Sequence, residues 1–178
     1  MADFQLVHRP AIASEPASFS SDFAMEALPE GTLVQVLGTP GGEDLAGLLG
    51  GLAAGADHAV RDAGPGQWLI VGDEAMPHAE LREFQRRLDG RAFCVDQSHG
   101  RVRIRVSGPA VATVLAKGTA VDFDAFGTGR SAMTLIGHIS VHMMRCGPES
   151  FELIVLRGFA ESLWHDLEAM ATEFKTPS

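Results

Sequence analysis

The spacing of apolar residues along the chain predicts two successive groups of strands and helices. In the first group, residues 33–37 and 68–71 form apolar runs that are typical of buried strands, and a shorter strand is expected near residues 58–60. Two helices are expected here, because apolar residues recur at helical spacing after residue 44 and again after Pro77. The apolar positions of these helices are Leu45, Leu48, Leu49 and Leu52, then Leu81, Phe84 and Leu88.

The second half of the chain repeats this order. Residues 101–106 alternate strictly between arginine and apolar side chains, which is the pattern of a strand with one buried face. A helix is expected after Gly108, followed by a long strand over residues 133–144, a turn at Gly147 and an apolar strand over residues 151–156. The last helix is predicted to place on one face Phe159, Leu163, Leu167, Met170 and Phe174.

Each half therefore has the order strand, helix, strand, strand, helix, which suggests an internal duplication. This order predicts an α+β fold of two similar halves, with mostly antiparallel sheet and helices on the outside. We predict an irregular N-terminal segment over residues 1–30 and a single α+β domain over residues 31–178. The domain would consist of two pseudo-repeats, residues 31–92 and 93–178.

The first 30 residues lack a periodic pattern, and residues 13–21 have the composition of a loop. Phe4, Leu6, Phe19 and Phe23 are nevertheless scattered through this segment. Large apolar side chains in an irregular segment need a covering surface, which either the same chain or a partner supplies. Both interpretations remain open at this point, and the segment is a candidate for a contact with another protein.

The charge balance narrows the kinds of partner that the chain can have. Of its 178 residues, 14 are basic and 23 are acidic, so the net charge is −9 at pH 7. An acidic chain repels phosphate groups, which argues against nucleic acid and against a membrane surface. An apolar run of about 18 residues and a signal-peptide pattern are both absent. We therefore expect a cytoplasmic protein in which Cys94 and Cys146 are free thiols.

The histidines suggest a metal hypothesis that the geometry of a strand disfavours. His138, His142 and Cys146 follow one another at intervals of four residues, in or next to the predicted long strand. Their side chains would point to one face, but residues four apart on a strand lie roughly 13 Å from each other. Zinc needs three or four ligands around one ion. We therefore predict no metal site.

Three further motifs have a structural explanation that is simpler than a catalytic one. Ser107 is expected to cap the following helix, because the Gly-x-Ser-x-Gly frame of a hydrolase is absent. Residues 127–130 (Gly-Thr-Gly-Arg) are expected to form a loop, since they do not connect a strand to a helix as a phosphate-binding turn would. Arg101, Arg103 and Arg105 share one strand face, which is either solvated or directed at an acidic partner. We assign no catalytic, cofactor-binding or metal-binding residue.

Several segments resemble the sarcosine oxidase gamma subunit family. In the centre of the chain they are Arg105-Val106-Ser107-Gly108-Pro109-Ala110, then Val114-Leu115-Ala116-Lys117-Gly118, and Asp122. Near the C-terminus they are Phe151-Glu152-Leu153-Ile154-Val155, followed by Phe159-Ala160-Glu161-Ser162-Leu163-Trp164. Residues 67–71 resemble the counterpart in the first half. The resemblance runs from about Gly31 to Phe174, and it departs from the family at Thr119, where the family commonly has Cys.

The resemblance implies the fold of the folate-binding domain of aminomethyltransferases and a place in a complex of four different subunits. Such complexes oxidatively demethylate sarcosine to glycine, pass electrons to oxygen and deliver the one-carbon unit to tetrahydrofolate. The resemblance further implies that the partners are the alpha, beta and delta subunits. FAD, FMN, NAD and tetrahydrofolate are then expected on those subunits, and the gamma chain is expected to be structural and to bind no cofactor.

Three alternatives remain open. The chain could be the matching subunit of an N-methylglutamate dehydrogenase complex, a free-standing folate-binding or aminomethyltransferase-like protein, or a scaffold of an unrelated assembly. A related group of folate-binding repair proteins has a Lys-Gly-Cys-Tyr motif followed by Gly-Gln-Glu. Here Lys117-Gly118 is followed by Thr119, which argues against that group. The sequence does not distinguish the amine substrate, because substrate contacts are expected on another chain.

Overall fold

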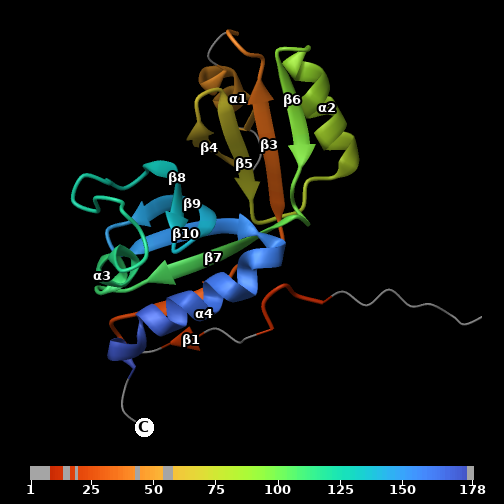
Figure 1. Ribbon diagram of the computed structural model, residues 1–178. Coiled ribbons are helices and arrows are strands. Elements are labelled where there is room, and N and C mark those ends of the chain that lie inside the picture. The colour runs from red at the N-terminus through yellow and green to blue at the C-terminus, as the bar shows by residue number, and fades with distance from the viewer. Residues whose placement is uncertain (1–8, 14–16, 19, 43–44, 54–57, 176–178) are drawn as a thin grey trace, which may run out of the picture.

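The computed structural model describes residues 9–13, 17–18, 20–42, 45–53 and 58–175, and it shows two sheets with helices on their outer faces (Figure 1). Sheet A has the strand order β1-β2-β7-β10-β9-β8, and sheet B has the order β4-β5-β3-β6. The strands of sheet A are β1 (Ala17–Ser18), β2 (Ala24–Ala27), β7 (Arg101–Ser107), β8 (Ser131–Ile136), β9 (Ile139–Gly147) and β10 (Ser150–Leu156). Those of sheet B are β3 (Thr32–Gly38), β4 (His58–Gly64), β5 (Gln67–Gly72) and β6 (Ala92–Asp96).

Two helices cover each sheet on the side that faces away from the other sheet. α1 (Ala46–Ala53) and α2 (His78–Leu88) pack on sheet B, whereas α3 (Val111–Ala116) and α4 (Ala160–Met170) pack on sheet A. Short 3-10 turns flank α4 at Arg157–Phe159 and Thr172–Phe174. Neighbouring strands pair in antiparallel fashion, so the prediction of an α+β fold with antiparallel sheets is confirmed.

The alternation of residues 101–106 builds the core of sheet A. Val102, Ile104 and Val106 are buried in one apolar cluster with Leu163 and Trp164 of α4. Each such side chain contributes roughly 1.5–3 kcal/mol when it leaves water, so this face holds α4 against the sheet. None of the helices in the described residues is long and apolar enough to cross a membrane.

Residues 133–144 form a hairpin instead of the single long strand that their apolar pattern predicts. β8 ends at Ile136, and β9 begins at Ile139 directly opposite it. Gly137 in the turn has a φ of +59°, a conformation that favours glycine. The prediction was wrong because two strands joined by a very short turn present the same run of apolar residues as one strand.

Part of the first 30 residues joins sheet A, where the sequence predicted an irregular segment. β2 pairs with β7 along its whole length. Phe23 and Met25 are buried in the core of sheet A, so the chain itself covers them. A strand of four residues is too short to show an alternating pattern, which is why it escaped prediction. Phe4, Leu6 and Phe19 lie outside the described residues.

A tight turn between β7 and α3 anchors the segment that leads into β2. The backbone N–H of Ala110 donates to the carbonyl oxygen of Asp22 at 3.0 Å. Gly108 has a φ of +116°, and a Cβ at this position would lie 2.3 Å from the same oxygen. Only glycine therefore permits this close approach of the two backbones.

The two sheets share a topology. The order β4-β5-β3-β6 in sheet B corresponds to β9-β10-β7-β2 in sheet A. In both, a helix follows the first strand (α1 or α3) and another follows the hairpin (α2 or α4). The outer strand next to β3 is β6, which follows its helix, whereas the equivalent strand next to β7 is β2, which comes from the N-terminal segment. This correspondence supports the proposal of an internal duplication. Sheet B extends to Asp96, four residues beyond the predicted end of the first pseudo-repeat, because β6 pairs with β3.

Candidate functional site

The two sheets meet through a buried cluster of charged side chains. Glu152 of β10 is 2% exposed and accepts hydrogen bonds from Arg61 Nη1 at 2.8 Å and Arg61 Nη2 at 3.0 Å. Arg103 of β7 donates to the same carboxylate through Nε at 2.7 Å. One carboxylate of sheet A therefore binds an arginine of its own sheet and an arginine of sheet B.

Arg103 extends this ion cluster to the end of β5. Its Nη1 donates to the Asp73 carboxylate at 2.7 Å and to the Gly72 carbonyl oxygen at 3.1 Å. Burial disfavours the ionised form of Glu152, but the hydrogen bonds and charges of Arg61 and Arg103 outweigh it and lower its pKa to about 2. Glu152 is therefore ionised at neutral pH, and the cluster combines two arginines with two carboxylates.

The balance of charges indicates that the ion cluster is structural. Each guanidinium already faces a carboxylate, so the cluster offers a substrate no unpaired charge of either sign. Apolar side chains from both sheets pack beside it, namely Leu33, Ala63, Leu69, Val71 and Ile154. Together the ion cluster and these side chains hold sheet B against sheet A.

The three arginines of β7 differ in their surroundings. Arg101, Arg103 and Arg105 do share one face of β7, but the face is directed at sheet B. Arg103 is 8% exposed, so the solvated interpretation is wrong for it, and its acidic partners belong to the same chain. Arg105 pairs with Glu26 of β2 at 3.0 Å. Burial lowers the pKa of Arg101, whose Nε has no hydrogen-bond partner among the described residues.

His142 is fully buried beside the ion cluster. Its Nε2 lies 2.9 Å from the carbonyl oxygen of Asp62, which also accepts a hydrogen bond from Ser131 Oγ at 2.8 Å. Burial lowers the His142 pKa first of all, and the neighbouring positive charge of Arg61 lowers it further. A neutral imidazole that donates through Nε2 therefore ties β9 to β4.

The structure separates the residues of the metal hypothesis. His138 lies in the turn between β8 and β9, His142 is buried in β9, and Cys146 is exposed near the end of β9. Among the described residues, no group of three or more His, Cys, Asp or Glu side chains is arranged to hold a metal ion.

The cysteines are poor candidates for nucleophiles. Burial raises the pKa of Cys94 to about 11, and burial together with the negative charge of Glu152 raises that of Cys146. Both thiols are therefore protonated at neutral pH, and the reactive thiolate is scarce.

The motifs that carry the family resemblance also have packing roles. Lys117 Nζ donates to the Met170 carbonyl oxygen and to Glu173 Oε1, both at 2.6 Å, and so ties the end of α3 to the end of α4. A Cβ at Gly118 would lie 2.8 Å from the Met170 sulfur. Thr119, where the family commonly has Cys, shares a hydrogen bond of 2.9 Å with the Thr134 hydroxyl.

Two of the other candidate motifs lie on turns. Ser107 is the last residue of β7 and does not cap α3, because the capping position is Ala110 and no side chain caps it. The sequence misplaced the cap because the chain makes a turn at Gly108 before the helix starts. Residues 127–130 precede β8, and Arg130 Nη1 donates to the Ala125 carbonyl oxygen at 2.9 Å, which is consistent with the predicted loop.

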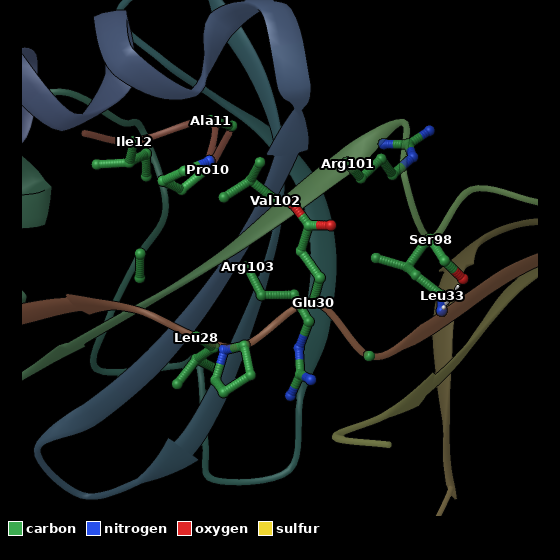
Figure 2. A pocket seen from close by; sticks show the side chains of 13 residues that line it. Pro10, Ala11, Ile12, Leu28, Glu30, Leu33, Ser98, Arg101, Val102 and Arg103 are labelled. Carbon is green, nitrogen blue, oxygen red and sulfur yellow. Dashed lines mark hydrogen bonds between the residues drawn. The ribbon is translucent and has the colours of Figure 1, made fainter. Parts of the chain in front are cut away.

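Two hollows near the junction of the sheets are lined in part by β7. A mostly apolar recess of about 310 Å³ lies between the N-terminal segment, the β2–β3 connection and β7, and Figure 2 shows its side chains. Arg101 stands at its edge, and Glu30 in its wall pairs with Arg157 at 2.6 Å. A polar groove of about 530 Å³ opens beside the ion cluster, with His58 and Cys146 in its walls.

Sequence reasoning missed most of the ion cluster. Arg61 and Asp73 belong to no recognisable motif. Glu152 was identified only as part of the segment 151–155, which resembles the family. A faint signal existed, because Glu152 interrupts an otherwise apolar strand and so has to be exposed or paired. The partners lie 91 and 49 residues away, so local patterns could not identify them.

The fold and the ion cluster together define a two-sheet α+β protein with a charge-compensated interior. The chain belongs to the sarcosine oxidase gamma subunit family, which matches residues 32–173. The sarcosine oxidase subunit gamma of Arthrobacter sp is 30% identical over 175 residues, covering 94% of this chain and 84% of that protein. The subunit gamma of Corynebacterium sp. (strain U-96) is 28% identical over 168 residues, covering 92% of this chain and 81% of that protein.

Solved structures show the same fold. A chain of the heterotetrameric sarcosine oxidase from Corynebacterium sp. U-96, in complex with pyrrole 2-carboxylate, superposes with a TM-score of 0.76 and 24% identity, covering 94% of this chain and 90% of that one. The glycine cleavage system aminomethyltransferase T from Bartonella henselae gives a TM-score of 0.55 and 15% identity, covering 81% of this chain and 45% of that one. The expected likeness to the aminomethyltransferase fold is confirmed.

Proposed function

We propose that the chain is the gamma subunit of a heterotetrameric sarcosine oxidase. The complex would oxidatively demethylate sarcosine to glycine and transfer the one-carbon unit to tetrahydrofolate. One observation carries this proposal: the family match spans residues 32–173, and the named gamma subunits align with more than 90% of this chain.

Within that complex the chain would act as a structural subunit in the cytoplasm. Its interior charges are paired with one another, and its two thiols are protonated, which supports a role other than catalysis. FAD, FMN, NAD and tetrahydrofolate would be bound by the alpha, beta and delta subunits, which are its proposed partners.

Co-expression with the three other subunit genes from the same genome tests this function. A tag on this chain is expected to recover the other subunits, and the purified complex should consume oxygen when sarcosine is added. Omitting this chain should abolish assembly or sarcosine-dependent turnover. A complex that assembles and turns over equally well without it would contradict the proposal.

The same preparation separates the alternatives. Turnover of N-methylglutamate with an electron acceptor other than oxygen, in place of sarcosine with oxygen, would identify the dehydrogenase complex. Tight binding of tetrahydrofolate to this chain alone would favour a free-standing folate-binding protein.

A further inference from the structure

One edge of sheet B is left open by the rest of the described chain. β6 pairs with β3 on one side, and no strand pairs with its other side among the described residues. β8, at the edge of sheet A, is covered in part by other segments of the chain. The Ser131 hydroxyl donates to the Asp62 carbonyl oxygen of β4, and Thr134 is hydrogen-bonded to Thr119. The edge of β6 is therefore a candidate binding surface for another chain.

The register of β6 identifies which backbone groups point outward. Gln97 N–H donates to the Leu33 carbonyl oxygen, and Thr39 N–H donates to the Arg91 carbonyl oxygen, so odd-numbered positions of β6 are bonded to β3. The even-numbered positions direct their N–H and C=O groups away from the sheet; they are Ala92, Cys94 and Asp96. Of these groups, only the Cys94 carbonyl oxygen has a contact among the described residues, a long one of 3.5 Å from Gln85 Nε2.

Exposed apolar side chains flank this free backbone. Phe93 is 66% exposed, more than any other large hydrophobic side chain in the described residues, and Val95 is 41% exposed. They stand on the face of sheet B that is directed toward sheet A, but sheet A covers only the other end of that face, around Leu33 and Val71. Natural edge strands are usually protected by lysine, proline or a bulge. β6 has none of these.

The distribution of charge favours a different chain over a second copy of this chain as the partner of β6. Residues 78–96, which comprise α2 and β6, contain four basic and four acidic residues, so the net charge of −9 comes from the rest of the chain. A second copy would bring another acidic body to this edge and would be repelled. Exposed Arg82 lies one helical turn before Gln85 on the surface of α2, and it would attract an acidic side chain that flanks an incoming strand.

We propose that the free edge of β6 binds an extended segment of a partner subunit, which adds to sheet B as an antiparallel or parallel strand. The segment would pair with the outward backbone groups of Ala92, Cys94 and Asp96, and its alternate apolar side chains would cover Phe93 and Val95. Acidic residues beside the segment would face Arg82. This inference rests on the proposed function as a subunit of the oxidase complex.

Two matched pairs of variants in the full chain, co-expressed with the other subunits, test the side chains and the backbone separately. Phe93→Asp is expected to lower recovery of the partner subunits about tenfold or more. Leu135→Asp, at a 54% exposed position on β8, should leave recovery unchanged. Asp96→Pro removes an outward N–H without disturbing pairing to β3 and should weaken recovery, whereas Asp96→Ala controls for loss of the carboxylate.

Hydrogen exchange supplies a readout of strand pairing. The amides of residues 91–97 should be more protected in the assembled complex than in the isolated chain, and circular dichroism should show that all four variants are folded. Equal recovery with Phe93→Asp and Asp96→Pro, or unchanged exchange, would overturn the proposal. A dimer of the isolated chain that Phe93→Asp disrupts would overturn the choice of partner. Failure of the unaltered chain to recover any subunit would contradict the proposed function instead.

Discussion

At the scale of single residues, Glu152 connects segments that are far apart in the sequence. It accepts hydrogen bonds from Arg61 in β4 and Arg103 in β7, and Arg103 in turn binds Asp73 at the end of β5. Ion pairs of this kind are costly to desolvate, and their net contribution to stability is often small. Breaking one is different, because the remaining charge stays buried without a partner.

Replacing Glu152 with Gln tests this directly. We expect the free energy of unfolding to fall by about 3–5 kcal/mol, because two buried guanidinium groups would lose their shared carboxylate. Urea denaturation followed by circular dichroism measures the loss. Glu26→Gln is the matched control, since it removes a carboxylate from a half-exposed pair with Arg105 and should cost at most about 1 kcal/mol. Similar losses for the two variants would argue against a special role of the ion cluster.

The same junction should make stability depend on pH through two groups, His142 and Glu152. The folded-state pKa of His142 lies below 6.5, so its stabilising contribution is complete above pH 6.5 and is lost as the pH falls below that value. The folded-state pKa of Glu152 is about 2 against an ordinary 4.5, so its contribution is complete above pH 4.5 and is lost between 4.5 and about 2.

Unfolding free energies measured across this pH range would separate the two groups. His142→Gln should flatten the decline that begins as the pH falls below 6.5, because the histidine that causes it is gone. Glu152→Gln should flatten the decline below pH 4.5 instead. Profiles of both variants that run parallel to that of the unaltered chain would show that neither group governs the acid response.

At the scale of elements, the length of a strand or turn decided whether the sequence analysis identified it. Helices α2 and α4 and strands β3, β5, β7 and β10 were predicted, because their apolar spacing extends over enough residues to be distinctive. β2 and β6 were not predicted, since each has at most five residues. The hairpin of β8 and β9 was predicted as one strand because its turn is a single Gly137-His138 pair.

The strand β2 has a consequence for the N-terminal segment. Phe23 is fully buried in the core of sheet A, so Phe23→Ala should lower the free energy of unfolding by about 3–5 kcal/mol. Phe93→Ala is the matched control at an exposed site, where we expect a change within about 0.5 kcal/mol. Removing residues 1–25 should destabilise the chain further, because Met25 and Ile12 leave the same core. A truncated chain with unaltered thermal stability would contradict this assignment.

At the scale of the whole molecule, the chain is expected to depend on its partners for chemistry. Purified alone, it should be colourless, because the sequence has no recognisable flavin-binding motif. Absorbance spectroscopy of the isolated chain checks this, and calorimetry with tetrahydrofolate should show no tight binding. A yellow preparation with one flavin for each chain would contradict the first expectation, and micromolar affinity for tetrahydrofolate would contradict the second.

The sequence by itself determined the fold class, the two similar halves and the family, because these depend on local periodicity and on contiguous motifs. The stacking of sheet B on sheet A was decided only by the tertiary structure. Arg103 occupies a polar position of an alternating strand, and Glu152 is the polar residue of a largely apolar one. Such positions look the same in sequence whether water or a second sheet covers them. The partner that covers a strand face lies many residues away, so only the folded chain shows which polar side chains are buried and paired.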